Sequence, residues 1–250
     1  MRTLRLTLAY DGTDFAGWQV QPDRPTVQGL VRDGCSRILG EPVKLTGASR
    51  TDAGVHALRQ SASLVTASSL DPGSLARGLN ALLPDAIRVL QASEAPAGFD
   101  ARRSAVGKRY LYLIDRGRVA HPLLRRFAWH PRFPLDVDAM RSALGALRGK
   151  HDFSAFCAAP GRGRRPTCTV RSARLRERGD RLAITLSADS FLHHMVRNVV
   201  GSLVDVGRGA QPASWMANLL AGRDRTRSGP TAPAQGLMLV RVLYGEAGRG

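Results

Sequence analysis

Residues 1–10, MRTLRLTLAY, carry an apolar side chain at every second position from Leu4 to Leu8. This period of two is typical of a β-strand with one buried face. Further elements are predicted along the first hundred residues: a helix from Val27 that Thr26 can cap and Gly40 ends, short strands PVKLT (42–46) and RQSASLVT (59–66), a helix beginning at Asp71-Pro72 and closed by Pro84, and a strand AIRVLQA (86–92). The order β-α-β-β-α-β is the split βαβ, or ferredoxin-like, arrangement.

The second half of the chain has a similar order of elements. The predicted elements are a strand KRYLYLI (108–114), a helix at 136–147, a hairpin at 169–188 that turns at 178–180, a long helix at 191–206, a helix at 211–221 and a closing strand GLMLVRVLY (236–244). We therefore expect an α+β protein of two halves, with residues 1–104 as the N-terminal half and 105–250 as the C-terminal half.

The charge of the chain is strongly basic. Its 37 basic and 20 acidic residues give a formal net charge of +17 at pH 7, and such a surface raises the local concentration of polyanions. Only Lys44, Lys108 and Lys150 are lysines. Arginine binds phosphate through two parallel hydrogen bonds, so its excess favours a nucleic-acid partner. The codon usage of a GC-rich genome explains much of the preference for arginine over lysine, but it does not explain the net charge.

Cysteine content and hydropathy indicate the compartment. The chain has three cysteines with no pairing pattern, and its first residues lack the apolar run of a signal peptide. No run of 18 apolar residues is present, so no membrane span is predicted. We therefore expect a cytoplasmic protein.

Three segments do not fit the pattern of a buried core, namely 10–21 (YDGTDFAGWQVQ), 47–57 (GASRTDAGVHA) and 191–198 (FLHHMVRN). Loops that follow strand ends commonly carry functional sites. Taken alone, Asp11 and Asp14 are best interpreted as turn residues, and Asp52 as a turn or cap.

Together these segments resemble the tRNA pseudouridine synthase A family over nearly the whole chain. The motifs that carry the resemblance are YDGTDFAGWQVQ with TVQGLV, SRTDAGVHA, FDARRSAVGKRYLYLI and FLHHMVRNVVGSL. One departure is Ser49, where the family commonly has glycine. The resemblance implies two fused ferredoxin-like halves with a central, mostly antiparallel sheet and an active-site cleft between them. It also implies a homodimer that converts uridines 38, 39 and 40 of the tRNA anticodon arm to pseudouridine, without a metal or another cofactor.

The resemblance further implies roles for individual residues. Asp52 matches the catalytic aspartate, and Arg197 matches the basic residue that pairs with it. Tyr110 matches the pocket tyrosine, and Arg50 is expected to fill the space left by the flipped base or to hold its phosphate. Two further stretches are expected to bind the RNA: Phe99, Asp100, Ala101, Arg102 and Arg103, and Gly161, Arg162, Gly163, Arg164 and Arg165.

Alternative functions make different demands on the sequence. Glycoside hydrolysis needs two carboxyl groups, whereas the loop around Asp52 contains one acid. His193 and His194 are adjacent, so on a helix they would point in different directions, which argues against a shared metal ion. A non-catalytic RNA-binding protein of two ferredoxin-like modules remains the alternative. It would require aromatic residues in a pattern that KRYLYLI matches only poorly.

Overall fold

The computed structural model describes residues 1–158 and 166–245. The chain divides into two compact units. Unit 1 contains residues 1–107 together with the described residues from Met238 onward, and unit 2 contains residues 108–237. The chain passes from unit 1 to unit 2 within strand β5 (Ala105–Asp115) and returns at the start of strand β9 (Leu237–Tyr244).

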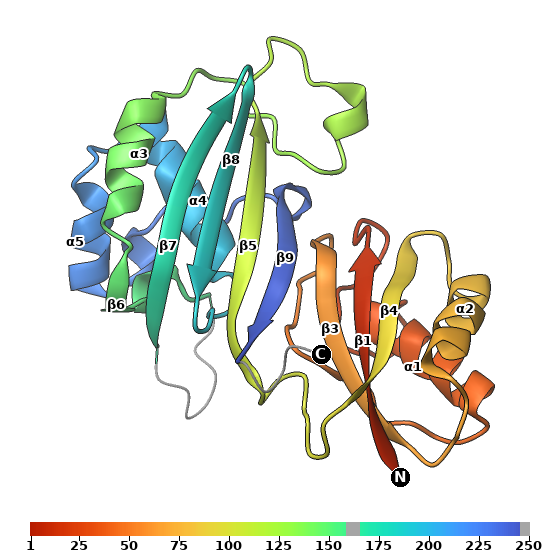
Figure 1. Cartoon of the computed structure of the whole chain (residues 1–250). Coiled ribbons are helices and arrows are strands. Elements are labelled where there is room, and N and C mark those ends of the chain that lie inside the picture. Colours follow the sequence, from red (N-terminus) through yellow and green to blue (C-terminus); the bar gives the residue numbers. More distant parts are fainter. Residues whose placement is uncertain (159–165, 246–250) are drawn as a thin grey trace. The chain divides into compact units, whose positions relative to one another are not determined.

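Unit 1 is built on a sheet with the strand order β4-β1-β3-β9, and a short strand β2 pairs with β3 (Figure 1). The bounds of its elements are β1 Arg2–Tyr10, α1 Val27–Leu39, β2 Thr46–Gly47, β3 His56–Thr66, α2 Pro72–Leu82 and β4 Ile87–Ala95. All the strand pairs are antiparallel except β3 with β9. The predicted order β-α-β-β-α-β is confirmed.

Local chemistry explains where these elements begin and which faces they bury. Leu4, Leu6 and Leu8 are fully buried, as the alternating pattern predicts. The side chain of Thr26 accepts a hydrogen bond from the Gly29 amide at the start of α1, and that of Asp71 accepts one from the Ser74 amide at the start of α2. Both predicted helix starts are therefore confirmed.

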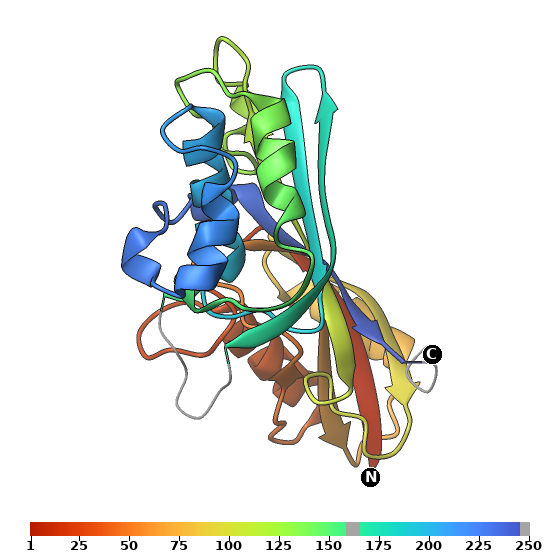
Figure 2. The ribbon, with the colours of Figure 1, turned by 90° about the vertical axis from the view of Figure 1, so that its left-hand side faces the viewer.

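Unit 2 contains a second sheet segment with the strand order β5-β8-β7-β6, in which all adjacent strands are antiparallel. Helices α3, α4 and α5 lie on one face of it (Figure 2). The bounds of its elements are α3 Val137–Gly145, β6 Gly149–Asp152, β7 Thr167–Arg178, β8 Arg181–Ala188, α4 Met195–Gly207 and α5 Trp215–Gly222, with short 3₁₀ turns at Pro122–Leu124, Ser154–Phe156, Arg225–Arg227 and Ala234–Gly236.

One observed strand was not predicted, and three predicted elements differ from the observed ones. Strand β6 was not predicted, because GKHD has no apolar alternation and forms only through pairing with β7. The strand expected at 42–46 is reduced to the two residues of β2. Helix α5 begins at Trp215 instead of Gln211. Helix α4 begins at Met195 instead of Phe191, because His194 has a left-handed backbone (φ 59°) that a regular helix excludes.

The α+β class and the mostly antiparallel strand pairing are confirmed. Within the described part of the chain, no helix is long and apolar enough to cross a membrane.

Candidate functional site

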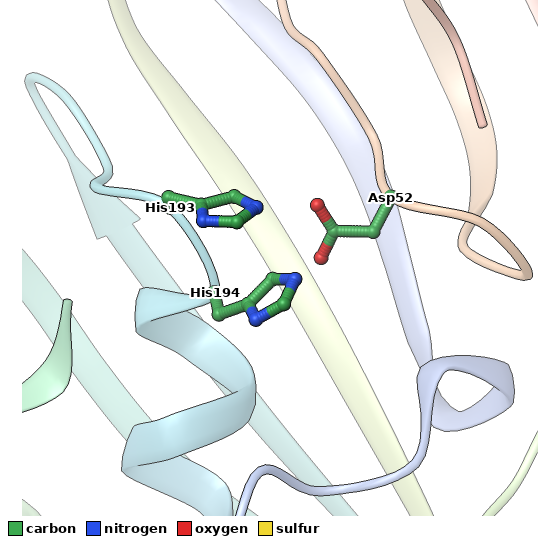
Figure 3. Close-up of side chains that lie close together, drawn as sticks. All are labelled: Asp52, His193 and His194. Atoms are coloured by element: carbon green, nitrogen blue, oxygen red, sulfur yellow. The ribbon is translucent and has the colours of Figure 1, made fainter. Parts of the chain in front are cut away.

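The loop at 48–55 connects β2 to β3 and carries Asp52 (Figure 3). Thr51 is buried, Asp52 is partly exposed and Arg50 is exposed. The amide of Val55 donates to the Asp52 carbonyl oxygen at 3.1 Å, and Gly54 has a left-handed backbone (φ 77°). The loop therefore turns tightly just after Asp52, and glycine serves that turn because it lacks a Cβ.

Ser49 adopts an ordinary backbone conformation. The described non-glycine residues with positive φ are Asp23, His194 and Arg223. Ser49 is buried, and its amide and carbonyl groups both bind the side chain of Gln60. Serine in place of the family's glycine therefore introduces no backbone strain here.

The segment after β1 contacts the end of this loop. The carboxylate of Asp11 accepts hydrogen bonds from the amide and hydroxyl of Thr13, so its interpretation as a turn residue is confirmed. The same carboxylate also lies 3.1 Å from Nδ1 of the buried His56. The Gly12 amide donates to this nitrogen at 3.0 Å. No role was predicted for His56, because one histidine after a turn has no distinctive spacing.

The stretch from Phe99 to Arg103 combines buried and exposed residues. Ala101 is fully buried; its amide donates to Ser63 Oγ at 3.0 Å, and its carbonyl oxygen accepts from Tyr244 at 2.8 Å. The Phe99 ring packs against the Tyr244 ring at 5.1 Å between centroids. Phe99 and Ala101 thus anchor the stretch within unit 1, and their contact with RNA stays a prediction.

Asp100 organises the two arginines of this stretch. Its carboxylate accepts hydrogen bonds from the amides of Arg102 (2.9 Å) and Arg103 (2.8 Å). Both arginine side chains are exposed. The arrangement therefore presents two guanidinium groups to solvent from a turn that a carboxylate holds in place. Their predicted contact with phosphate is compatible with this exposure.

In unit 2, Tyr110 and Tyr112 lie on the same face of β5, as alternation predicts. Tyr110 is 6% exposed, and its ring meets that of Phe191 edge to face at 5.0 Å. Tyr112 is fully buried and donates to the Pro233 carbonyl oxygen at 2.8 Å. Burial raises the pKa of Tyr112, and the nearby charge of Arg197 offsets part of that rise. Tyr112 is therefore a core residue.

Arg197 lies in the first turn of α4. Its Nε donates to the Ala232 carbonyl oxygen at 2.8 Å, and its own carbonyl oxygen accepts from the Ala232 amide at 3.1 Å. The first bond fixes the stem of the side chain to the segment before β9, and the second fixes the backbone of Arg197 to the same segment. Asp52 belongs to unit 1, and its ion pair with Arg197 stays a prediction.

The expected orientation of His193 and His194 is wrong. Their rings lie close together, with centroids 3.9 Å apart and planes at 31° (Figure 3). Both residues precede the first residue of α4, and the left-handed backbone of His194 turns the chain between them. The argument that two adjacent histidines diverge applies within a regular helix, and neither histidine lies in one.

The second predicted RNA-binding stretch, Gly161, Arg162, Gly163, Arg164 and Arg165, lies outside the described residues. Its assignment stays a prediction of the sequence.

Comparisons with known proteins show the family to which the chain belongs. The family model described as tRNA pseudouridine synthase matches residues 7–102 and 143–245. Among curated relatives, the tRNA pseudouridine synthase A of Myxococcus xanthus is 45% identical over 98% of this chain and 92% of its own length. Those of Brevibacillus brevis (43% identical; 98% of this chain and 100% of the relative) and Bordetella petrii (45%; 98% and 92%) are similarly close. These matches, which span both units and include the loop of Asp52, show that the chain belongs to the tRNA pseudouridine synthase family.

Proposed function

We propose that this chain isomerises uridines 38, 39 and 40 of the tRNA anticodon arm to pseudouridine, with Asp52 as the nucleophile. Members of the family are isomerases that act on uridine in tRNA. The observation that carries the assignment of Asp52 is its place in the loop between β2 and β3. It is the only acidic residue from 48 to 55, and its side chain is partly exposed while Thr51 before it is buried.

The reaction explains why one carboxylate is enough. The bond from uracil N1 to ribose C1′ breaks, the base turns, and C5 joins C1′. C5 then loses its proton, and N1 gains one. Product and substrate contain the same atoms, so no water is consumed and no second carboxyl group is needed to activate one. The base must leave its stack before a side chain can reach C1′.

Supporting roles follow from the chemistry of the remaining residues. We propose that Tyr110 stacks on the extruded uracil and that Arg197 pairs with Asp52, since a guanidinium favours the charged form of a neighbouring carboxylate. Arg50 is exposed two residues before Asp52, where it can hold a phosphate or fill the space that the base leaves. Arg102 and Arg103 are proposed to bind the RNA backbone.

We further propose that the enzyme is a cytoplasmic homodimer. The basis for the compartment is the chemistry of Cys35, Cys157 and Cys168, which are all present as buried thiols and suit a reducing environment. Sedimentation of the purified protein would test the dimer, since a monomer at micromolar concentration would contradict it.

The test of the proposed function uses an unmodified tRNA transcript and carbodiimide labelling, which marks pseudouridine. The wild-type protein should convert uridines at 38–40, whereas Asp52→Asn should convert none and should bind tRNA with nearly unchanged affinity. Appreciable turnover by Asp52→Asn would remove this residue from the mechanism. Binding without conversion by the wild-type protein would favour the alternative of a non-catalytic RNA-binding protein.

A further inference from the structure

We propose that Tyr10 is a positioning residue for the reaction, which acts through a hydrogen bond between its hydroxyl and that of Thr51, the residue before Asp52. The inference rests on the proposed role of Asp52 as nucleophile. Tyr10 is the last residue of β1 and is 4% exposed. Its hydroxyl lies 2.8 Å from Thr51 Oγ1 in the loop, so the effect on the chemistry that we propose passes through the loop.

Three buried side chains connect the sheet of unit 1 to the loop. The hydroxyl of Tyr10 lies 2.8 Å from Thr51 Oγ1. Nε2 of Gln60, in strand β3, lies 3.4 Å from the same Tyr10 hydroxyl and makes a weaker hydrogen bond to it. Gln60 is fully buried and Thr51 is 6% exposed. Polar groups buried at this depth are costly unless they are paired, so their pairing specifies one arrangement of the loop.

Gln60 also holds the other end of the loop. Its Oε1 accepts from the Ser49 amide at 3.2 Å, and its Nε2 donates to the Ser49 carbonyl oxygen at 2.7 Å. The loop is thus fixed at Ser49 by Gln60 and at Thr51 by Tyr10. Arg50 lies between these two points and Asp52 follows directly after them, so small movements of Thr51 are passed to the Asp52 carboxylate.

The backbone of the segment after β1 also contacts the loop that carries Asp52. The Trp18 amide donates to the Thr51 carbonyl oxygen at 3.0 Å. Gly17 has φ 97°, and a Cβ at this position would lie 2.7 Å from that carbonyl oxygen and 3.0 Å from the Asp52 carbonyl carbon. Only glycine permits this approach. The segment therefore packs backbone against backbone on the loop, and the Tyr10 hydroxyl adds a side-chain hydrogen bond to Thr51.

A nucleophile that attacks C1′ must lie at contact distance and in line with the bond that breaks. A displacement of about 1 Å can lower the rate about 100-fold, because the reacting atoms then leave the productive geometry. Removing the Tyr10–Thr51 bond should therefore lower kcat. It should leave KM for tRNA unchanged, since the change alters the position of Asp52 and removes no group that is proposed to bind the RNA.

The experiment is a double-mutant cycle on kcat with Tyr10→Phe and Thr51→Val, which each remove one hydroxyl and keep most of the side-chain volume. We expect each single variant to lower kcat by about 10- to 100-fold, with KM within about twofold of wild type. The double variant should be no slower than the slower single variant, since both changes remove the same bond. Thr51→Ser, which keeps the hydroxyl, should restore most of the rate.

The matched control is Asn80→Leu, in the same unit. The Asn80 side chain makes two hydrogen bonds with the backbone of Val89, which lies in β4 and not in the loop. It should lower the stability of unit 1 while kcat at 25 °C stays at the wild-type value.

Three results would overturn the inference: unchanged kcat in Tyr10→Phe, losses that multiply in the double variant, or an equal loss of kcat in Asn80→Leu. Activity retained by Asp52→Asn would instead contradict the proposed function. The two failures are therefore distinguishable.

Discussion

Nε of Arg197 donates to the carbonyl oxygen of Ala232 at 2.8 Å, and the two residues form a second hydrogen bond between their backbones. The contact joins the first turn of α4 to the segment that leads into β9. The side-chain bond uses Nε, the guanidinium nitrogen nearest the aliphatic stem. The direction of the two terminal nitrogens is therefore set by the main chain of unit 2, before any substrate binds.

Arg197→Lys should lower the single-turnover rate nearly as much as Arg197→Met, by about 10-fold or more. Lysine keeps the charge, but its single nitrogen cannot bind the Ala232 carbonyl oxygen and a second partner in the geometry that arginine offers. Rapid-quench measurements with saturating enzyme would give the rates. A lysine variant with the wild-type rate would show that charge alone matters at this position.

Binding of tRNA should become less sensitive to salt when Arg102 and Arg103 are both changed to glutamine. Each lost phosphate contact should reduce the slope of log K against log salt concentration by roughly 0.7 to 0.9, because fewer counterions are released. The matched control is Arg37→Gln with Arg77→Gln, two exposed arginines on α1 and α2. An equal change of slope in both pairs would indicate a general charge effect instead of a phosphate contact.

Activity should survive exhaustive treatment with EDTA and need no added nucleotide. Uridine and pseudouridine are isomers, so the reaction requires neither an electron donor nor a second substrate. Conversion of a tRNA transcript would be measured before and after chelation. Loss of activity that a single added metal ion restores would contradict this expectation.

The sequence predicted those features that depend on local patterns. The leucines of β1, the caps Thr26 and Asp71, and the turn between β7 and β8, where Gly179 has φ 55°, each have a signal within a few residues. The start of α4 was misplaced because FLHHM leads into the apolar pattern of the helix, and no local signal indicates the left-handed backbone of His194. The role of Gln60 could not be predicted, since its partners Ser49 and Tyr10 are distant along the chain and meet only through strand pairing.

Asn198→Leu should lower the free energy of unfolding by about 2 to 4 kcal/mol, because it leaves several buried polar groups without partners. Asn198 is fully buried; its side chain donates to the Phe156 carbonyl oxygen and accepts from Arg225 and Thr231. Urea denaturation would measure the change. The control Asn218→Leu alters an exposed residue of α5 and should stay within about 0.5 kcal/mol of wild type. Equal losses in the two variants would contradict the importance of the buried network.

Stability at alkaline pH should depend on Cys35. This residue of α1 is fully buried, and burial raises the pKa of its thiol from 9.0 to about 12. Between these values the unfolded chain has lost the proton while the folded chain keeps it. Rising pH therefore favours unfolding, by about 1.4 kcal/mol per pH unit from this group. The contribution is fully present below pH 9 and decreases as the pH rises above it.

Cys35→Ala removes this titration. The difference in unfolding free energy between wild type and variant should be constant from pH 7 to 8.5. It should then shift in favour of the variant by about 1.4 kcal/mol per unit between pH 9.5 and 11. Tyr112 is also buried with a raised pKa, but it is present in both proteins and cancels in the difference. Urea midpoints of the RNA-free protein would supply the values, and a difference that stays constant up to pH 11 would show that Cys35 ionises in the folded state as readily as in the unfolded chain.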